Sequence, residues 1–350
     1  MLRAALKIVV ALLVVSVAGI ASLALINDYD INSRGDVVTE AASMSILRTP
    51  EERFAELADF PFQPHYLTID DPDLGELRVH YLDEGPADGA GNGETIVLLH
   101  GQATWSYSFR KMIPLLTSAG YRVIAPDFVG FGRSDKPANW KDHTFKKHTV
   151  WLDKTLSALN VEGATGFLFD WGGYFALRVL ADKPELFSRV VLCTTTMPRA
   201  NSLFGAVWVA LWRRRVLTPE VFPISSMVGE MTHNGISEET VKGLDAPYPD
   251  ETYKAGPRRF PMMIPATLLN PATIDNREAW KKLKNWNGPA ITLVSELNAK
   301  RGFNPQEFYD QLSGTAGQAH QTYPDTSFFI IEEIPEELAE QTLAFIKANP

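Results

Sequence analysis

The stretch that decides the fold is Gly166-Phe-Leu-Phe-Asp170-Trp171-Gly172-Gly173, an apolar run followed by an acid, a tryptophan and two glycines. The apolar part predicts a buried strand, and the glycines predict a tight turn into a helix. A strand, a turn and a helix in this order are typical of a nucleophile elbow, with Asp170 in the nucleophile's position. A carboxylate there can displace a leaving group from an sp³ carbon and form an alkyl ester. Aspartate before a helix is also a common N-cap, so this stretch alone leaves both interpretations open.

A second strand end, earlier in the chain, supports the catalytic interpretation. The run Leu98-Leu99-His100-Gly101-Gln102 ends an apolar strand with a glycine turn. A turn in this place supplies a backbone N–H to an oxyanion hole, so the backbone N–H groups of Gln102 and Trp171 are predicted to act together. Two such strand ends in this chain order indicate the α/β-hydrolase type of fold.

Short apolar runs recur through the rest of the chain and predict its sheet. They are Thr95–Leu99, Arg122–Pro126, Gly166–Phe169, Arg189–Cys193 and Ile291–Ser295. Helical patterns lie between several of them, for example Leu152, Leu156 and Leu159 on one face. This alternation predicts an α/β protein with a mostly parallel central sheet flanked by helices. Leu77–Leu82 alternates apolar and polar residues and predicts a strand near a sheet edge.

Residues 197–270 interrupt this alternation and contain no clean strand signal. We predict a helical cap there, inserted between two strands and covering the carboxyl ends of the sheet, where ligands of such folds bind. The predicted organisation is therefore a signal anchor at 1–26, a linker at 27–43, an α/β-hydrolase core at 44–196 and 271–350, and a cap at 197–270. The basic cluster Arg213–Arg215 in the cap is expected to form a solvated face rather than an anion site.

The N-terminus differs from the rest of the chain. Arg3 and Lys7 precede Ile8–Ile26, a run of nineteen residues without a charge. A helix of that length spans about the hydrocarbon thickness of a bilayer. The positive charges before it predict a membrane-anchored protein whose domain lies outside the cytoplasm. A signal peptide cut near Ala24, followed by secretion, is the alternative.

Composition excludes several classes of function. A net charge of −9 repels phosphate backbones, which argues against a nucleic-acid partner. The single cysteine, Cys193, cannot form an internal disulfide or a multi-cysteine metal site, and we expect it to be a buried apolar residue. The seven histidines show no HExxH spacing. Neither a metal nor another cofactor is therefore expected.

From Met44 to its C-terminus the sequence resembles the haloalkane dehalogenases, most closely the subfamily in which two tryptophans hold the halide. The HG and DWGG motifs also occur in epoxide hydrolases, whereas the amino-acid sequence of the cap is more specific to the haloalkane dehalogenases. The resemblance implies an α/β-hydrolase fold and a small apolar, halogenated substrate. The matching segments are Leu99–Pro114, Arg122–Pro137, Asp170–Gly173, Asp245–Pro261 and Asn285–Gly288.

The resemblance also implies roles for individual residues. Asp170 corresponds to the nucleophile that expels halide, and Trp171 to one halide-binding donor. Trp212 lies where the second halide-binding tryptophan of this subfamily is found. Indole suits this role because its N–H donates, accepts nothing, and can sit in an apolar wall. Trp171 argues against the fluoroacetate dehalogenases, which have arginine after the aspartate, and His100 and His148 match structural positions of the family.

The chain departs from the family where the ester would be hydrolysed. The family uses a water activated by a histidine, which an acid orients. Asn298 stands in the acid's place, and Phe328 or Phe329 stands in the histidine's place. The alternative acid position offers only Thr194–Thr196. Halide displacement is thus expected to persist while turnover loses its base.

Two nearby groups are conceivable substitutes for the lost triad members. They are His320 and Glu296, but His320 precedes the final strand and is expected at its wrong end. Phe169 is a further departure, since the family usually has a polar residue before the nucleophile.

Three functions remain in competition. The first is a dehalogenase-type hydrolase, active or weakly active, and the second is a non-catalytic relative that binds a small apolar ligand or a partner. The third is an epoxide hydrolase, which needs two cap tyrosines. It is the least favoured because residues 197–244 contain no tyrosine and only Tyr248 and Tyr253 lie just beyond that segment. The sequence indicates no oligomeric state.

Overall fold

The computed structural model describes residues 45–87, 89–200, 203–300 and 305–350. The predicted anchor at 1–26 and the linker at 27–43 lie outside these ranges. Among the helices within them, none is both long enough and apolar enough to cross a bilayer.

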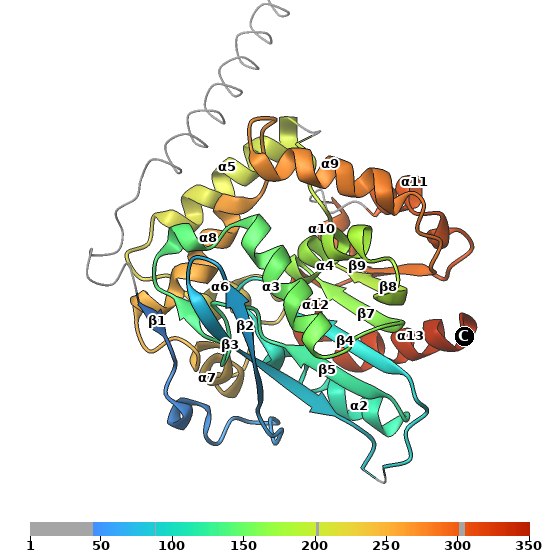
Figure 1. Cartoon of the computed structure of the whole chain (residues 1–350), viewed down its shortest axis with the longest axis horizontal. Coiled ribbons are helices and arrows are strands. Elements are labelled where there is room, and N and C mark those ends of the chain that lie inside the picture. The colour runs from blue at the N-terminus through green and yellow to red at the C-terminus, as the bar shows by residue number, and fades with distance from the viewer. Residues whose placement is uncertain (1–44, 88, 201–202, 301–304) are drawn as a thin grey trace, which may run out of the picture.

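The core of the molecule is one eight-stranded sheet (Figure 1). Six neighbouring strands run parallel, and an antiparallel hairpin, β2 with β3, extends one edge beyond β5. In spatial order the strands are β10 (Gln321–Tyr323), β9 (Ala290–Ser295), β8 (Phe187–Cys193), β7 (Ala164–Phe169), β4 (Thr95–Leu99), β5 (Arg122–Pro126), β3 (Gly75–Glu84) and β2 (His65–Asp71). A separate antiparallel pair joins β1 (Ile46–Leu47) to β6 (Lys136–Pro137).

The strands predicted from apolar runs are present, and β4 and β5 have the predicted bounds. The runs are continuous rather than alternating because both faces of the sheet are covered. Within β4, Ile96 and Leu98 belong to one buried cluster while Val97 and Leu99 belong to the other. The alternating strand Leu77–Leu82 lies within β3, one position from the edge strand β2.

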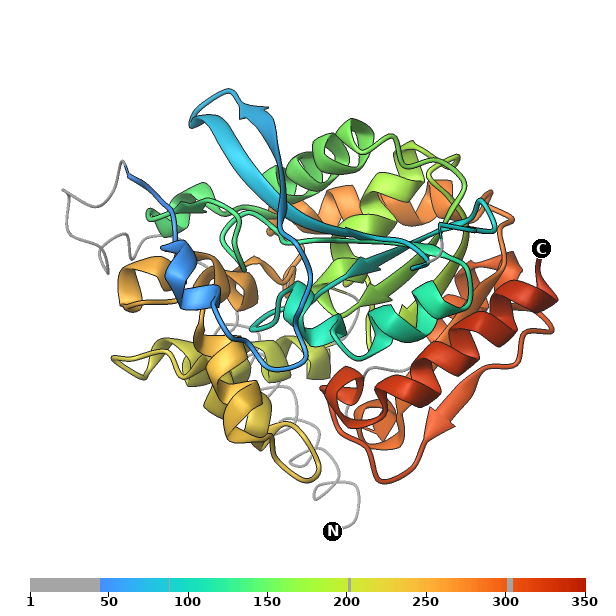
Figure 2. The same ribbon diagram turned by 90° about the horizontal axis from the view of Figure 1, so that it is seen from below.

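Helices cover both faces of the sheet (Figure 2). On one face α3 packs on α4 and α4 packs on α9, while on the other α2 packs on α13. Pro335 begins α13 because proline suits the first helical position. The core helices are α2 (Met112–Ser118), α3 (Phe145–Ala158), α4 (Trp171–Asp182), α9 (Pro271–Leu283), α10 (Glu296–Lys300), α11 (Gln306–Gln311), α12 (Ile330–Glu333) and α13 (Pro335–Ala348). Short 3₁₀ helices are η1 (Glu51–Phe54), η2 (Ser106–Phe109), η3 (Trp140–Asp142), η4 (Glu251–Lys254) and η5 (Ser313–Thr315).

The described part of the connection from β8 to β9 consists of helices joined by turns and loops, and it has no strand. It contains α5 (Leu203–Leu217), α6 (Ile224–Glu230), α7 (Glu238–Asp245) and α8 (Ala255–Met263), followed by α9. In Figure 1, α5 and α8 lie beyond one end of the sheet. These helices therefore stand where a cap would cover the carboxyl ends of the strands.

One prediction for this segment was wrong. Arg213 was expected on a solvated face, but only 1% of it is exposed. Its guanidinium donates to the carbonyl oxygens of Pro261, Met262 and Ile264, at 3.0, 3.1 and 2.8 Å. A cation at the end of α8 satisfies carbonyl groups that the helix itself leaves unpaired. Its neighbours Arg214 and Arg215 are exposed, as predicted.

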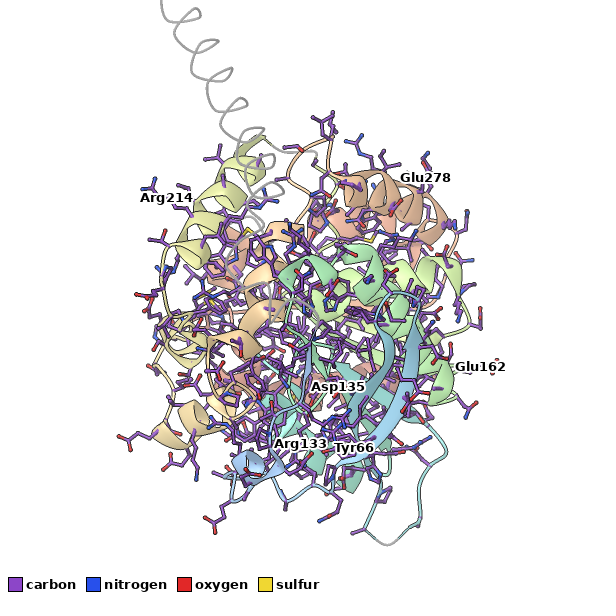
Figure 3. The ribbon with its side chains drawn as sticks, turned by 60° about the vertical axis from the view of Figure 1, so that its left-hand side comes forward. Tyr66, Arg133, Asp135, Glu162, Arg214 and Glu278 are labelled. Carbon is purple, nitrogen blue, oxygen red and sulfur yellow. The ribbon has the colours of Figure 1, made fainter. Side chains whose placement is uncertain are left out.

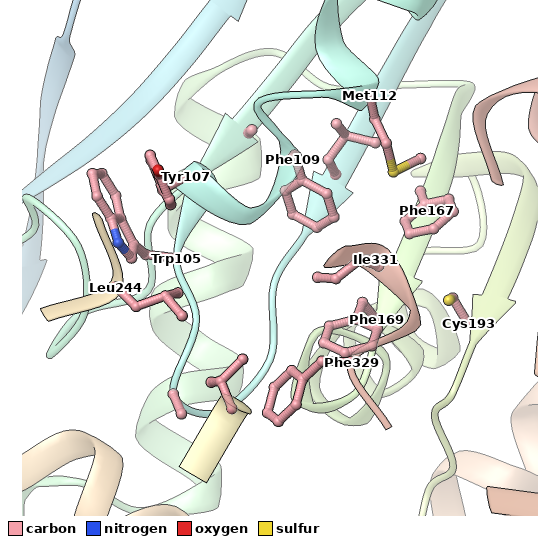
Figure 4. Packing of buried hydrophobic residues seen from close by; sticks show 14 of the residues in the cluster. Trp105, Tyr107, Phe109, Met112, Phe167, Phe169, Cys193, Leu244, Phe329 and Ile331 are labelled. Atoms are coloured by element: carbon pink, nitrogen blue, oxygen red, sulfur yellow. The ribbon is translucent and has the colours of Figure 1, made fainter. Parts of the chain in front are cut away.

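Apolar packing runs continuously from the sheet to the ends of its strands (Figure 4). Phe167, Phe169 and Cys193 lie in one buried cluster with Phe329 and Ile331. Cys193 is fully buried, which confirms its expected role as a small apolar core residue.

Candidate active site

Asp170 forms the sharp turn between β7 and α4. Its backbone has φ 49° and ψ −119°, which is a conformation that L-residues rarely adopt. The turn is tight because Gly172 lies against the Leu99 carbonyl oxygen, where a Cβ would approach closer than 3.0 Å. Thr195 donates from its hydroxyl to the Asp170 carbonyl oxygen at 2.7 Å and so supports the strained turn from β8. Strain maintained by the surrounding structure is a common feature of functional sites.

The two predicted oxyanion-hole groups meet at this carboxylate. The backbone N–H of Gln102 donates to Asp170 Oδ2 at 2.9 Å, and the backbone N–H of Trp171 also hydrogen-bonds to the carboxylate. Gly101 allows this approach, since a Cβ there would collide with the Asp170 side chain. Although Asp170 is at the N-cap position of α4, its side chain makes no capping hydrogen bond. Its carboxylate therefore faces the β4 turn, and the N-cap interpretation fails.

Burial controls the charge of this carboxylate. Only 4% of Asp170 is exposed, and desolvation raises its pKa to about 7. The N–H groups of Gln102 and Trp171 oppose the rise because they hydrogen-bond to the charged form. Asp170 is thus a carboxyl group that ionises near neutral pH.

An enclosed cavity of about 30 Å³ opens onto Asp170. This volume holds only one or two water molecules. Except for Gln102 and Asp170 the walls are almost entirely apolar or aromatic, and they include both predicted halide-binding tryptophans. The lining residues are Gln102, Asp170, Trp171, Tyr174, Trp208, Trp212, Met227, Met231, Ile264, Phe328 and Phe329.

The structure brings Trp171 and Trp212 to the same cavity from different segments. Trp171 begins α4 directly after Asp170, whereas Trp212 lies on α5. The indole ring of Trp212 is stacked nearly parallel to that of Trp208, with their ring centroids 6.0 Å apart. In the part of the chain that the structure describes, no protein group accepts a hydrogen bond from the indole N–H of Trp171 or Trp212. The two indoles are therefore available to an acceptor within the cavity.

The predicted positions of the missing base and acid are also adjacent in space. The Asn298 side-chain amide donates to the Ser327 carbonyl oxygen at 3.2 Å, directly before Phe328. Phe328 and Phe329 both line the cavity, and their ring centroids lie 6.1 and 6.2 Å from that of Phe169. Phe328 is partly buried, whereas Phe329 is buried within the core cluster.

None of the described histidines lines this cavity. His100 accepts from the Phe128 N–H and contacts the Gly101 carbonyl oxygen, and burial lowers its pKa to about 4. His148 pairs with His143 at 3.0 Å, as expected of a structural residue. His320 contacts backbone atoms of Thr292 and Thr315 with its two ring nitrogens. Of the described residues, no group of three or more His, Cys, Asp or Glu could hold a metal ion.

Several lining residues were not identified from the sequence. Tyr174 follows Asp170 by four positions on α4, and Trp208 precedes Trp212 by four on α5, so helical periodicity contained a signal for both. Met227, Met231 and Ile264 come from other segments and had no such signal. The tyrosines considered for an epoxide hydrolase, Tyr248 and Tyr253, do not line the cavity.

Comparisons with known proteins agree with this geometry. A family described as the α/β-hydrolase fold matches residues 94–291, which confirms the predicted fold. A haloalkane dehalogenase of Psychrobacter cryohalolentis is 41% identical over 307 residues, covering 88% of this chain and 100% of its own. One from Mycolicibacterium paratuberculosis is 40% identical over 305 residues, covering 87% and 99%. The tetrameric haloalkane dehalogenase DpaA from Paraglaciecola agarilytica has a TM-score of 0.77 at 32% identity, covering 86% of this chain and 98% of its own.

Proposed function

The chain belongs to the haloalkane dehalogenase family of the α/β-hydrolase fold, and from this we propose that Asp170 displaces halide from a small, apolar haloalkane. The observation that carries the proposal is the Asp170 carboxylate, which faces an apolar cavity and accepts backbone hydrogen bonds from Gln102 and Trp171. Family membership supports a hydrolase that acts on carbon–halogen bonds.

The first chemical step needs only groups that line the cavity. One oxygen of ionised Asp170 attacks the carbon that bears the halogen, and the electron pair of the carbon–halogen bond leaves with the halide. The indole N–H groups of Trp171 and Trp212 receive the halide as its charge develops. The backbone N–H of Gln102 keeps the carboxylate in place. The product is an alkyl ester on Asp170.

The second step, hydrolysis of this ester, lacks the residues that catalyse it in the family. Hydrolysis of the ester requires a base that removes a proton from water. By the resemblance, Phe328 or Phe329 stands in the place of the base and neither can accept a proton, and Asn298 stands in the place of the orienting acid. We therefore propose that the ester accumulates, so that the protein is alkylated once rather than turning over.

Intact mass tests this proposal on the full chain. After incubation with 1,2-dibromoethane, we expect one alkyl adduct per chain and one equivalent of bromide. The adduct should be absent from Asp170→Ala. Sustained bromide release would contradict the proposed trapping and indicate another base. A folded protein that forms no adduct and releases no bromide would favour the alternative, a non-catalytic relative that binds a small apolar ligand.

The location of the protein is a separate proposal. We propose that Ile8–Ile26 anchors the chain in a membrane with its catalytic domain outside the cytoplasm; cleavage near Ala24 is the alternative. Fractionation of cells followed by intact mass distinguishes the two. An uncut chain in the membrane fraction supports the anchor, whereas a soluble chain that begins near Leu25 would show cleavage.

A further inference from the structure

A second and larger cavity lies beside the first. It is an open groove of about 540 Å³ formed by α5, α6 and the segment between them. Sites for small organic ligands generally measure about 300–1,000 Å³ and are mostly apolar. The groove has this size, and its apolar wall consists of Leu211, Val216, Phe222, Pro223 and Met227. The cavity at Asp170, about 30 Å³, is too small to enclose more than the end of a substrate.

Met227 connects the two spaces. It lines both the inner cavity and the outer groove, and among the described residues it alone is common to the two linings. The adjacent residues Leu211 and Trp212 on α5 point to different spaces, since Leu211 lines the groove and Trp212 the inner cavity. Methionine has three rotatable bonds and adapts its shape easily. A shift of the Met227 side chain would therefore join the groove to the nucleophile.

Positive charge stands at the rim of the groove. Arg214 and Arg215 both line it and are exposed. Arg215 forms an ion pair with Glu230, which also lines the groove, whereas Arg214 has no acidic partner among the described residues. Figure 3 shows the Arg214 side chain extending outward from the body of the molecule. In a protein with a net charge of −9, Arg214 provides a local positive charge at the groove, which attracts an anion.

We propose that the groove binds the tail of the substrate, and that the substrate is a halogenated straight alkyl chain with a carboxylate at the opposite end. The halogenated carbon reaches Asp170 past Met227, the methylene chain lies on Leu211, Val216 and Phe222, and the carboxylate meets Arg214. This inference rests on the proposed function, because the same displacement by Asp170 takes place: a carbon–oxygen bond forms and halide leaves with the bonding electrons. The distant carboxylate does not react.

The test compares two reagents that differ only in the terminal group. Initial alkylation rates of the full chain by 8-bromooctanoate and 1-bromooctane are measured by intact mass at equal concentrations. We expect 8-bromooctanoate to react about fivefold faster, as one exposed ion pair allows. Arg214→Glu should remove this preference. Lys242→Glu is the matched control, since Lys242 is an exposed cation on α7 outside the groove, and it should keep the preference.

Equal rates for the two reagents, or a preference that Arg214→Glu leaves unchanged, would overturn the inference. If no haloalkane alkylates the chain, the proposed function fails, and calorimetric titration with decanoate then tests the groove alone. Saturable binding of decanoate that Arg214→Glu weakens about fivefold would support a site for anionic chains. Absence of decanoate binding, or binding that this substitution does not change, would refute it.

Discussion

Two regions meet at the same cavity, and they differ in what they retain of the family's chemistry. The turn after β7 has a strained nucleophile position, two backbone donors and glycines at close contacts. The segment after β10 instead presents Phe328 and Phe329, with the Asn298 amide against the Ser327 carbonyl. Under the proposed function, the two chemical steps depend on separate parts of the fold, so that one can be lost while the other persists.

The physical reason lies in how each region is stabilised. Asp170 is positioned by backbone geometry, which does not depend on a histidine. The segment after β10 is stabilised by side-chain packing. The ring centroids of Phe328 and Phe329 lie 5.2 Å apart, and they lie 6.1 and 6.2 Å from the ring centroid of Phe169. Aromatic pairs of this kind contribute about 0.5–1.5 kcal/mol beyond the burial of their area. Phe169 therefore lies among apolar neighbours, which suit an aromatic side chain at this position.

Restoring the base gives the largest expected effect. The double variant Phe328→His, Asn298→Asp should convert the stable adduct into a transient one, because a general base contributes about 10²–10⁴-fold. The measurement is bromide release per chain, which should exceed one equivalent. Phe329→His, Asn298→Asp serves as the matched control and should turn over more slowly. Equal turnover by both would contradict the assignment of Phe328 to the base's place.

Closing the space at the turn tests the other region. Gly172→Ala places a Cβ against the Leu99 carbonyl oxygen, and a backbone contact cannot relax as a flexible side chain does. We expect the free energy of unfolding to fall by about 3 kcal/mol, measured by urea denaturation. Gly85→Ala is the control, because nothing lies within 4 Å of its added Cβ. A similar small loss in both variants would show that the turn tolerates a side chain.

The pH dependence of alkylation reports on the charge of Asp170. Only the ionised carboxylate attacks, and burial raises its pKa to about 7, so the rate should rise with pH. The ionised fraction increases about 100-fold between pH 5 and pH 9 for this pKa. Alkylation rates by 1,2-dibromoethane across that range test this. A rate that is already maximal at pH 5 would mean that the carboxylate retains an ordinary pKa.

The smallest expected effect concerns the halide. Trp212→Phe removes one indole N–H from the cavity and should weaken bromide binding about tenfold, because a hydrogen bond to a charged group contributes about 1.5 kcal/mol or more. Bromide quenching of tryptophan fluorescence measures this affinity. Trp208→Phe removes the neighbouring indole that lies parallel to it. If Trp208→Phe weakened bromide binding more than Trp212→Phe, the second halide donor would be Trp208.

Much of the fold could be predicted because it follows from local patterns. A parallel strand covered on both faces needs an unbroken apolar run, and the bounds of β4 and β5 were therefore predicted correctly. The positions of Asp170 and Gln102 at strand ends likewise follow from chain order and glycine turns. The burial of Arg213 was not predicted because its hydrogen-bond partners, the carbonyl groups at the end of α8, lie 48 to 51 residues further along the chain.

The sequence by itself determined the strand pattern and the positions of Asp170 and Gln102 at strand ends, since each depends on the residue type and its neighbours. Only the tertiary structure decided which distant segments line the cavity at Asp170, how small that cavity is and where the outer groove lies. These properties arise from side chains of distant segments that pack together, as Met227, Trp212 and Phe328 do around Asp170. Packing in three dimensions, unlike periodicity, leaves no repeat along the chain from which it could be predicted.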